Sequence, residues 1–142
     1  SVESQSTNAF LAMIPEPEKY NKIAISKKWD VEVIGSNGKA KVIVNPGHKQ
    51  TLAVSIFDGL RKTSKHHFPT FFDNPGSNIS DNILDRMVDY FWDEENDQVV
   101  MLSHGGGLKT KETMENYGDR LARAWELSYV KGETLTQVKE IR

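Results

Sequence analysis

The dipeptide Asn37-Gly38 constrains the fold of this chain more than any other sequence feature. It lies between two segments in which apolar and polar residues alternate, 29–34 (WDVEVI) and 39–44 (KAKVIV). Asn-Gly favours a two-residue type I′ turn, whose twist matches that of two antiparallel strands. The sequence therefore predicts a β-hairpin over about residues 29–45.

This turn also sets the register of the predicted hairpin. Val33 would lie opposite Val42, and Val31 opposite Val44, with Trp29 on the same apolar face. The lysines and acidic residues of the two segments would lie on the other face. Register and polarity therefore agree, and we expect these apolar residues to be buried.

Two further segments predict amphipathic helices. After Ser80, a suitable N-cap, apolar residues recur at helical spacing until the acidic stretch 93–97. These residues are Ile83, Leu84, Met87, Val88 and Phe91. Residues 110–130 show a similar period and predict a longer helix, and the tail 134–141 fits an edge strand or a short helix.

Residues 45–60 allow two interpretations. Asn45-Pro46 can begin a helix, whose apolar stripe would be Leu52, Ala53, Ile56, Phe57 and Leu60. The alternation of Leu52, Val54 and Ile56 also fits a third strand of the sheet. We prefer the helix.

The order of these elements predicts an α+β fold, in which two or three amphipathic helices pack on one face of a small antiparallel sheet built on the hairpin. Short strands are also expected at 20–25 and 99–102. A chain of 142 residues has the size of one domain. We expect a polar, mobile segment over 1–18 and a single domain over 19–142.

The composition excludes several kinds of site. Without cysteine, the sequence has no disulfide, no thiolate nucleophile and no cysteine-ligated zinc or iron–sulfur centre. No apolar run approaches the roughly 20 residues that span a bilayer. The first residue is Ser, so we expect a processed mature chain or a soluble domain of a longer one, with an extracytoplasmic location preferred.

The net charge of −2 gives no overall attraction to nucleic acid. Charge is nevertheless divided between the halves of the chain. Residues 1–71 contain ten basic and six acidic residues, and residues 72–142 contain eight basic and fourteen acidic residues. A local basic surface is therefore possible in the first half.

Basic and aromatic residues gather in segment 61–72, the candidate binding residues being Arg61, Lys62, Lys65, His66, His67, Phe68, Phe71 and Phe72. Aromatic anchors with arginine are typical of protein interfaces, and cations with stacking rings also suit single-stranded nucleic acid. Phenylalanines folded into the core beside solvated cations would give the same pattern. We prefer protein contact to nucleic-acid binding.

A glycine-rich loop follows the predicted strand 99–102. It contains His104, Gly105, Gly106 and Gly107, whose backbone N–H groups can bind an anion ahead of a helix. The stretch resembles the HGGG oxyanion loop of lipase-like α/β-hydrolases and, more loosely, the Ser-His-Gly-Gly at a strand end of histidine phosphatases. The sequence has neither the Gly-x-Ser-x-Gly elbow of the first nor the early Arg-His-Gly of the second. It therefore offers an anion-binding candidate, with a tight structural connection as the alternative.

Acidic residues recur every four positions in the segment that follows Ser80. They would lie along one side of the predicted helix, where Asp85 and Asp89 are candidate ligands for a divalent cation. A solvated outer face explains the same spacing. The histidines show no zinc-ligand spacing, and the sequence contains no Walker A, Rossmann or EF-hand motif. We therefore expect no metal and no cofactor.

These patterns favour a non-enzymatic binding or accessory domain that acts through protein contacts, as a soluble part of a larger or membrane-associated assembly. The first alternative is a small hydrolase or phosphate-handling enzyme in which His104 is the acid or base, near Asp73 or His67. The second is nucleic-acid binding through 61–72. A protein partner is expected, and a nucleic-acid partner is not favoured.

Overall fold

The computed structural model describes residues 1–64, 69–75, 79–93, 98–103, 115–116, 118–119, 121–129, 132 and 136–141. The chain divides into two compact units, Ser1–Gly107 and Leu108–Arg142. Within the described residues, no helix is long and apolar enough to cross a membrane.

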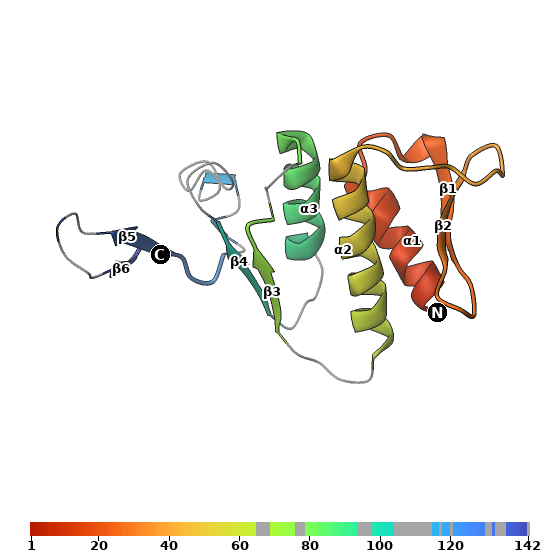
Figure 1. Ribbon diagram of the computed structural model, residues 1–142. Coiled ribbons are helices and arrows are strands. Elements are labelled where there is room, and N and C mark those ends of the chain that lie inside the picture. The colour runs from red at the N-terminus through yellow and green to blue at the C-terminus, as the bar shows by residue number, and fades with distance from the viewer. Residues whose placement is uncertain are drawn as a thin grey trace. The chain divides into compact units, whose positions relative to one another are not determined.

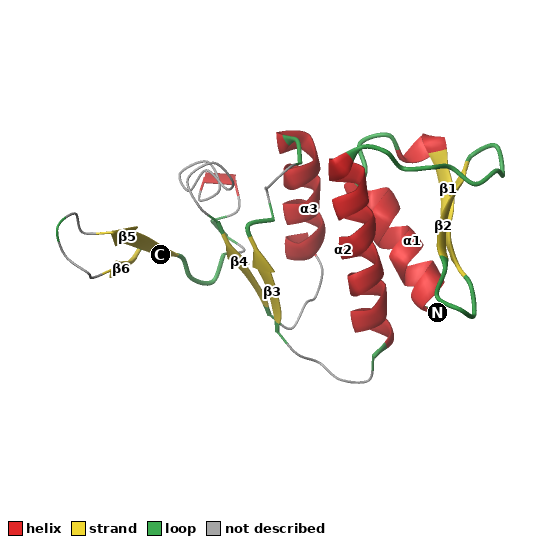
Figure 2. Cartoon of the chain, in the orientation of Figure 1, coloured by secondary structure: helices red, strands yellow, loops and turns green. Residues whose placement is uncertain are grey.

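Helices form the centre of the first unit, as Figures 1 and 2 show. They are α1 (Val2–Met13), α2 (Pro46–Thr63) and α3 (Asp81–Asp93). Beside α1, after the short 3-10 helix η1 (Pro17–Lys19), strands β1 (Tyr20–Ile25) and β2 (Val31–Gly35) pair antiparallel. Beside α3, strands β3 (Thr70–Asp73) and β4 (Val99–Leu102) pair parallel. Helices with small sheets make this an α+β fold, as predicted.

Helix α1 lies within residues 1–18, the stretch that the sequence analysis assigns to a polar terminal segment. The Ser1 hydroxyl accepts a hydrogen bond from the backbone N–H of Ser4, and the helix ends at Met13, with Ile14 as its C-cap before a proline. Its buried side consists of Ser6, Ala9, Phe10 and Met13. This stretch is therefore a packed helix that buries one polar residue, Ser6, with its apolar ones, because burial follows the helical period rather than mean polarity.

Two hydrophobic clusters meet at α1. The first joins Phe10 to β1 and β2 through Tyr20, Ile23 and Val33, and the rings of Phe10 and Tyr20 pack edge to face with centroids 5.3 Å apart. The second joins α1 to α3, β3 and β4, and it comprises Ala9, Met13, Met87 and Phe91 with Phe72, Val99 and Met101 at its margin. The buried stripe predicted for α3 is thus confirmed.

The predicted hairpin turn forms, but its register is wrong by one residue. The predicted second strand, 39–44, is also wrong, because only Ala40 forms a β-bridge and residues 41–44 are not in a strand. The observed pairing places Ile34 opposite Ala40, and the backbone N–H of Lys41 donates to the carbonyl of Val33 over 2.7 Å. The Gly35 N–H donates to the Lys39 carbonyl, so the loop has three residues rather than the predicted two. Within this loop only Gly38 has a positive φ (76°), and a single left-handed glycine suffices. The main antiparallel pair is β1–β2.

This register change exposes residues that were predicted to be buried. A one-residue shift moves every side chain of a strand to the opposite face. Val42 and Val44 are accordingly 83% and 77% exposed, whereas Val33 is 4% exposed. Trp29 is also exposed, because it adopts a left-handed conformation (φ 67°) that ends the alternation before β2.

Residues 45–60 form helix rather than strand, as preferred, and the Asn45 carboxamide oxygen caps α2 by accepting from the N–H groups of Gly47 and His48. The predicted apolar stripe is not its buried face, since Phe57 and Leu60 are exposed. The buried residues are Gly47, Thr51, Ser55, Asp58 and Gly59. Small residues allow α1 to approach closely, and a Cβ built on Gly59 would lie 2.1 Å from the Ser6 hydroxyl.

The second unit contains a hairpin of β5 (Trp125–Tyr129) and β6 (Thr136–Glu140). The helix predicted over 110–130 is therefore wrong at its C-terminal end, because Trp125, Leu127 and Tyr129 alternate in a strand and pair across to β6. The strand alternative for the tail is confirmed. Every residue of both strands is exposed.

Candidate functional site

The C-terminal end of α2 holds two of the predicted binding residues in a buried polar cluster. Asp58 is fully buried, and its carboxylate accepts hydrogen bonds from Arg61 (2.8 and 3.1 Å) and from the Tyr90 hydroxyl of α3 (2.7 Å). Lys62 Nζ lies 3.2 Å from the same carboxylate and donates to the Tyr90 hydroxyl at 2.6 Å. A buried carboxylate needs such partners, because its desolvation is costly. Lys62 therefore helps to join α2 to α3 through Tyr90, while Arg61 pairs with Asp58 within α2.

The rest of the predicted basic-aromatic segment does not form one described surface. Lys65, His66, His67 and Phe68 lie outside the described residues. On β3, Phe72 packs against Phe91 with ring centroids 4.7 Å apart, whereas Phe71 is 65% exposed. The structure thus separates core and surface phenylalanines, and among the described residues it leaves Phe71 as the exposed aromatic of this segment.

Polar residues follow the carboxyl ends of the two parallel strands. Asp73 ends β3 opposite Leu102 of β4, and the N–H of the next residue, Asn74, donates to the Leu102 carbonyl over 2.7 Å. Asn74 has a positive φ of 52°, which turns the chain sharply away from the strand. Ser103 follows β4 directly. The carboxyl edge of a parallel sheet is where α/β proteins bind ligands.

The glycine-rich anion-binding candidate continues from this edge. His104, Gly105, Gly106 and Gly107 lie outside the described residues, so the role predicted for them stays a prediction. Asp73, one of the two residues expected near His104, is nonetheless placed at the end of the strand adjacent to β4. The sequence places His104 two residues after the end of that neighbouring strand.

The acidic side of α3 is a solvent-facing surface. Asp85 and Asp89 are both exposed, on the side opposite the buried stripe of this helix. Among the described residues, no group of three or more histidine, aspartate or glutamate side chains could hold a metal ion. The candidate metal role of Asp85 and Asp89 remains a prediction.

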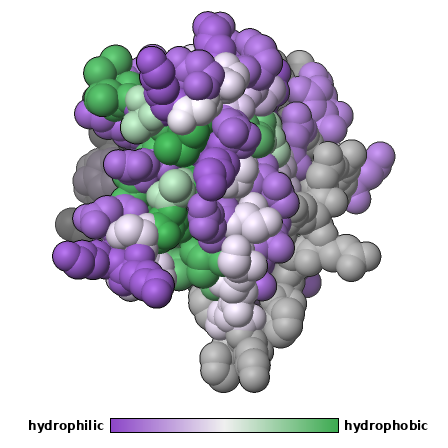
Figure 3. Space-filling model, turned by 90° about the vertical axis from the view of Figure 1, so that its right-hand side faces the viewer, coloured by the Kyte–Doolittle hydropathy of each residue, from purple (hydrophilic) through white to green (hydrophobic). Residues whose placement is uncertain are grey.

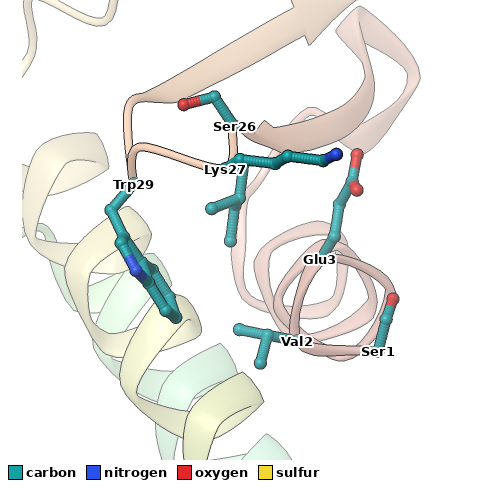
Figure 4. A pocket seen from close by; sticks show the side chains of 7 residues that line it. Ser1, Val2, Glu3, Ser26, Lys27 and Trp29 are labelled. Atoms are coloured by element: carbon teal, nitrogen blue, oxygen red, sulfur yellow. The ribbon is translucent and has the colours of Figure 1, made fainter.

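Sequence reasoning missed a pocket beside Trp29. It has a volume of about 340 Å³ and lies between the start of α1 (Ser1–Glu3) and the β1–β2 turn, where Ile25, Ser26, Lys27 and Trp29 line it. Figure 4 shows the Trp29 and Val2 side chains bordering this space, with Lys27 and Glu3 pointing toward each other. The Ser26 hydroxyl holds the turn by accepting from the N–H groups of Lys28 and Asp30. No sequence pattern predicts that this tryptophan adopts a left-handed backbone conformation, and the pocket was therefore missed.

Comparison with known proteins finds this fold among the head domains of SMC proteins. No protein-family model matches the sequence, and no curated protein matches it. A structure concerning ATP-driven dimerization and DNA-stimulated activation of SMC ATPases superposes with a TM-score of 0.69 at 13% identity, covering 99% of this chain and 83% of that chain.

Two Smc heads from Pyrococcus are similar in the same way. The Smc head domain with a coiled coil and joint from Pyrococcus yayanosii superposes with a TM-score of 0.68 at 11% identity, covering 99% of this chain and 26% of that chain. The Pyrococcus furiosus Smc head with an extended coiled coil is bound to the C-terminal domain of ScpA. It superposes with a TM-score of 0.66 at 12% identity, covering 99% of this chain and 34% of that chain. The chain thus spans about a quarter to a third of these two heads, with which it shares a fold.

Proposed function

We propose that this chain is a component of a larger assembly built around an SMC-head-like fold, and that it acts there through protein contacts. The observation that carries the proposal is the superposition of nearly the whole chain on SMC heads, at 99% coverage of this chain. One of those heads is bound to ScpA, a protein partner. The Pyrococcus chains also contain much more polypeptide than the part matched here.

The β3–β4 sheet supports this proposal from physical grounds. Parallel sheets occur almost only where both faces are covered. One face of β3–β4 packs toward α3, while Phe71 and Leu102 are exposed. A partner that covers these side chains and adds strands would complete the sheet.

Site-specific photo-crosslinking in cells tests this function. A photoreactive phenylalanine analogue at Phe71 should crosslink to one defined polypeptide, which mass spectrometry identifies. The matched control is the same analogue at Glu18, an exposed residue of η1 far along the chain from β3, where no such product is expected. Absence of a product at Phe71, or equal products at both positions, contradicts the proposal.

A second function, phosphate or nucleotide handling, is favoured by one observation: Asp73 ends a strand whose parallel neighbour leads into His104 and the glycines. In P-loop NTPases an aspartate holds Mg²⁺ beside the phosphates. The sequence has no Walker A loop. We propose that Asp73 and His104 contribute to a site whose phosphate-binding loop another polypeptide segment supplies.

Thermal unfolding with inorganic phosphate and with Mg²⁺-ATP tests this second function. A ligand at about 100 times its dissociation constant adds about 2.7 kcal/mol of stability and raises the midpoint by several degrees. The rise should disappear in Asp73→Asn and His104→Ala and persist in Asp30→Asn, a control at an exposed aspartate. If the unfolding midpoint does not rise, either in the chain alone or with its crosslinked partner, the phosphate site is rejected and the first proposal is unaffected.

A further inference from the structure

Residues 39–44, between the Gly38 turn and α2, include two exposed apolar side chains. Val42 and Val44 are the most exposed large hydrophobic residues described in the first unit. Ile43, between them, packs against the cluster of Phe10 and Ile23. The segment is therefore anchored at Ile43 while its two valines face solvent.

The backbone of this segment also has free hydrogen-bonding groups. Lys39 and Lys41 bond to β2, through the Gly35 N–H to the Lys39 carbonyl (2.9 Å) and the Lys41 N–H to the Val33 carbonyl. Residues between two such bonds direct their own N–H and C=O away from the paired strand. Within the described part of the chain, the backbone groups of Ala40, Val42 and Val44 form no hydrogen bond with protein atoms. An extended peptide can use these groups.

The charged residues of the segment itself have one sign. Residues 36–50 contain three lysines, Lys39, Lys41 and Lys49, and no acidic residue. All three are exposed, and in the described part of the chain none forms an ion pair. Lys41 Nζ lies 4.4 Å from the centre of the Tyr20 ring. The nearby Glu16 carboxylate is already paired with Lys19.

These lysines select among possible occupants. Two copies of this segment would bring lysines together, and natural edges use lysine to prevent such self-pairing. A partner carrying acidic residues would instead be attracted, and its apolar residues would cover the valines. Figure 3 shows the face beside β1 and β2, where apolar side chains are exposed among hydrophilic ones.

We propose that residues 39–44 bind an extended acidic segment of a partner protein, in which apolar residues cover Val42 and Val44 and carboxylates lie against Lys39 and Lys41. Backbone pairing to the free groups of the segment supplies the extended geometry, as in recognition by strand addition. This surface lies on different elements from the β3–β4 face, and the proposal does not depend on either proposed function.

Binding of synthetic peptides to the full chain tests the proposal. The probe is a fluorescein-labelled peptide with the sequence Glu-Val-Glu-Val-Glu; the controls are Lys-Val-Lys-Val-Lys and Glu-Ser-Glu-Ser-Glu. Fluorescence polarisation should detect the first peptide only, and hydrogen exchange should show new protection at residues 40–44. No binding below about 1 mM, equal binding of the basic peptide, or protection only elsewhere overturns the proposal.

Matched variants identify the surface. The double variant Val42→Ser with Val44→Ser should weaken the probe about tenfold, because it removes two apolar contacts. Val138→Ser, a substitution at an exposed valine of β6, should leave the affinity unchanged. Lys39→Glu should lower affinity for the acidic probe and raise it for the basic peptide. Sedimentation analysis tests the other possible occupant, a second copy of this chain. A dimer that dissociates in the double variant would show an interface between copies and overturn the proposal of an acidic partner.

Discussion

The two antiparallel hairpins of this chain have similar apolar patterns and opposite burial. In β1–β2, Ile23 and Val33 face α1 and are buried. In β5–β6, Trp125, Leu127 and Tyr129 alternate along β5, with Val138 opposite Leu127, and all are exposed. Alternation thus predicts which face of a hairpin is suited to burial, but burial itself requires a separate element that packs on that face.

For β1–β2 the covering element is close in sequence. Helix α1 precedes β1 with only η1 between them, so the hairpin and its helix form one local unit. Among the described residues of the second unit, nothing buries the apolar face of β5–β6. A two-stranded hairpin is marginally stable alone, and we therefore expect the β5–β6 face to be covered in the proposed assembly.

The largest expected effect concerns the helices that support β1–β2. Asp58→Ala leaves Arg61 and Lys62 without their buried carboxylate and should cost about 3–5 kcal/mol of unfolding free energy. Urea denaturation followed by circular dichroism measures it. Asp30→Ala, at an exposed aspartate of the β1–β2 turn, is the control and should cost much less. Similar losses in both variants would mean that the buried cluster does not stabilise the helix layer.

A matched pair of valines tests the comparison directly. Val33 in β2 is 4% exposed and Val138 in β6 is 64% exposed. Val33→Ala should cost about 2 kcal/mol through lost burial and a residual cavity, and Val138→Ala less than about 0.5 kcal/mol. Urea denaturation of the purified chain measures both. Equal costs would show that β5–β6 is already covered within this chain.

A matched pair of glycines gives a smaller difference. Gly38, after β2, and Gly132, between β5 and β6, have φ of 76° and 92°, and neither has an atom within 4 Å of an added Cβ. Alanine therefore adds backbone strain alone, about 1 kcal/mol at Gly38. We expect Gly38→Ala to lower the global unfolding midpoint. Gly132→Ala should increase amide hydrogen exchange in β5–β6 and leave the global unfolding midpoint unchanged. A lowered midpoint in both variants would couple the two hairpins.

Local patterns predicted much of this fold. The capping Asn45, the stripe of α3 and the strand at Tyr20–Ile25 each depend on neighbouring residues, and each is confirmed. The errors arise where tertiary contacts decide. Helix α2 buries Thr51 and Asp58 because α1 and α3 pack against its small and polar side. The sequence of α2 alone does not indicate that this side is the buried one.

The candidate surfaces were less predictable for the same reason. Arg61 and Lys62 suggested an exposed basic patch, although their spacing from Asp58, three and four residues, is that of helical ion pairs and could have indicated the buried cluster. The exposure of Val42 and Val44 depends on one residue of loop length. The carboxyl edge at Asp73 required the pairing of β3 with β4, which lie far apart in sequence.

The smallest expected effect lies in η1, where the chain enters β1. A hydrogen bond from Lys19, opposed by slight desolvation and reinforced by the charge of Lys19, lowers the pKa of Glu16 below its ordinary value. The same contact raises the pKa of Lys19. In the second unit, the ion pair between Arg123, which precedes β5, and Glu140 of β6 is longer, at 3.8 Å.

Lys19→Met should therefore raise the pKa of Glu16 toward that of an ordinary glutamate, as carboxyl chemical shifts in an NMR titration would show. A carboxylate whose pKa is lowered by folding adds stability above its unfolded pKa, and this contribution disappears as the pH falls through the folded pKa. The stability of the wild-type chain should therefore fall more steeply than that of Lys19→Met across this acidic range. Because both groups are exposed, the difference is small and decreases with added salt. An unchanged Glu16 titration in Lys19→Met would show that this ion pair is absent in solution, and that β1 needs only the packing of its buried face against α1.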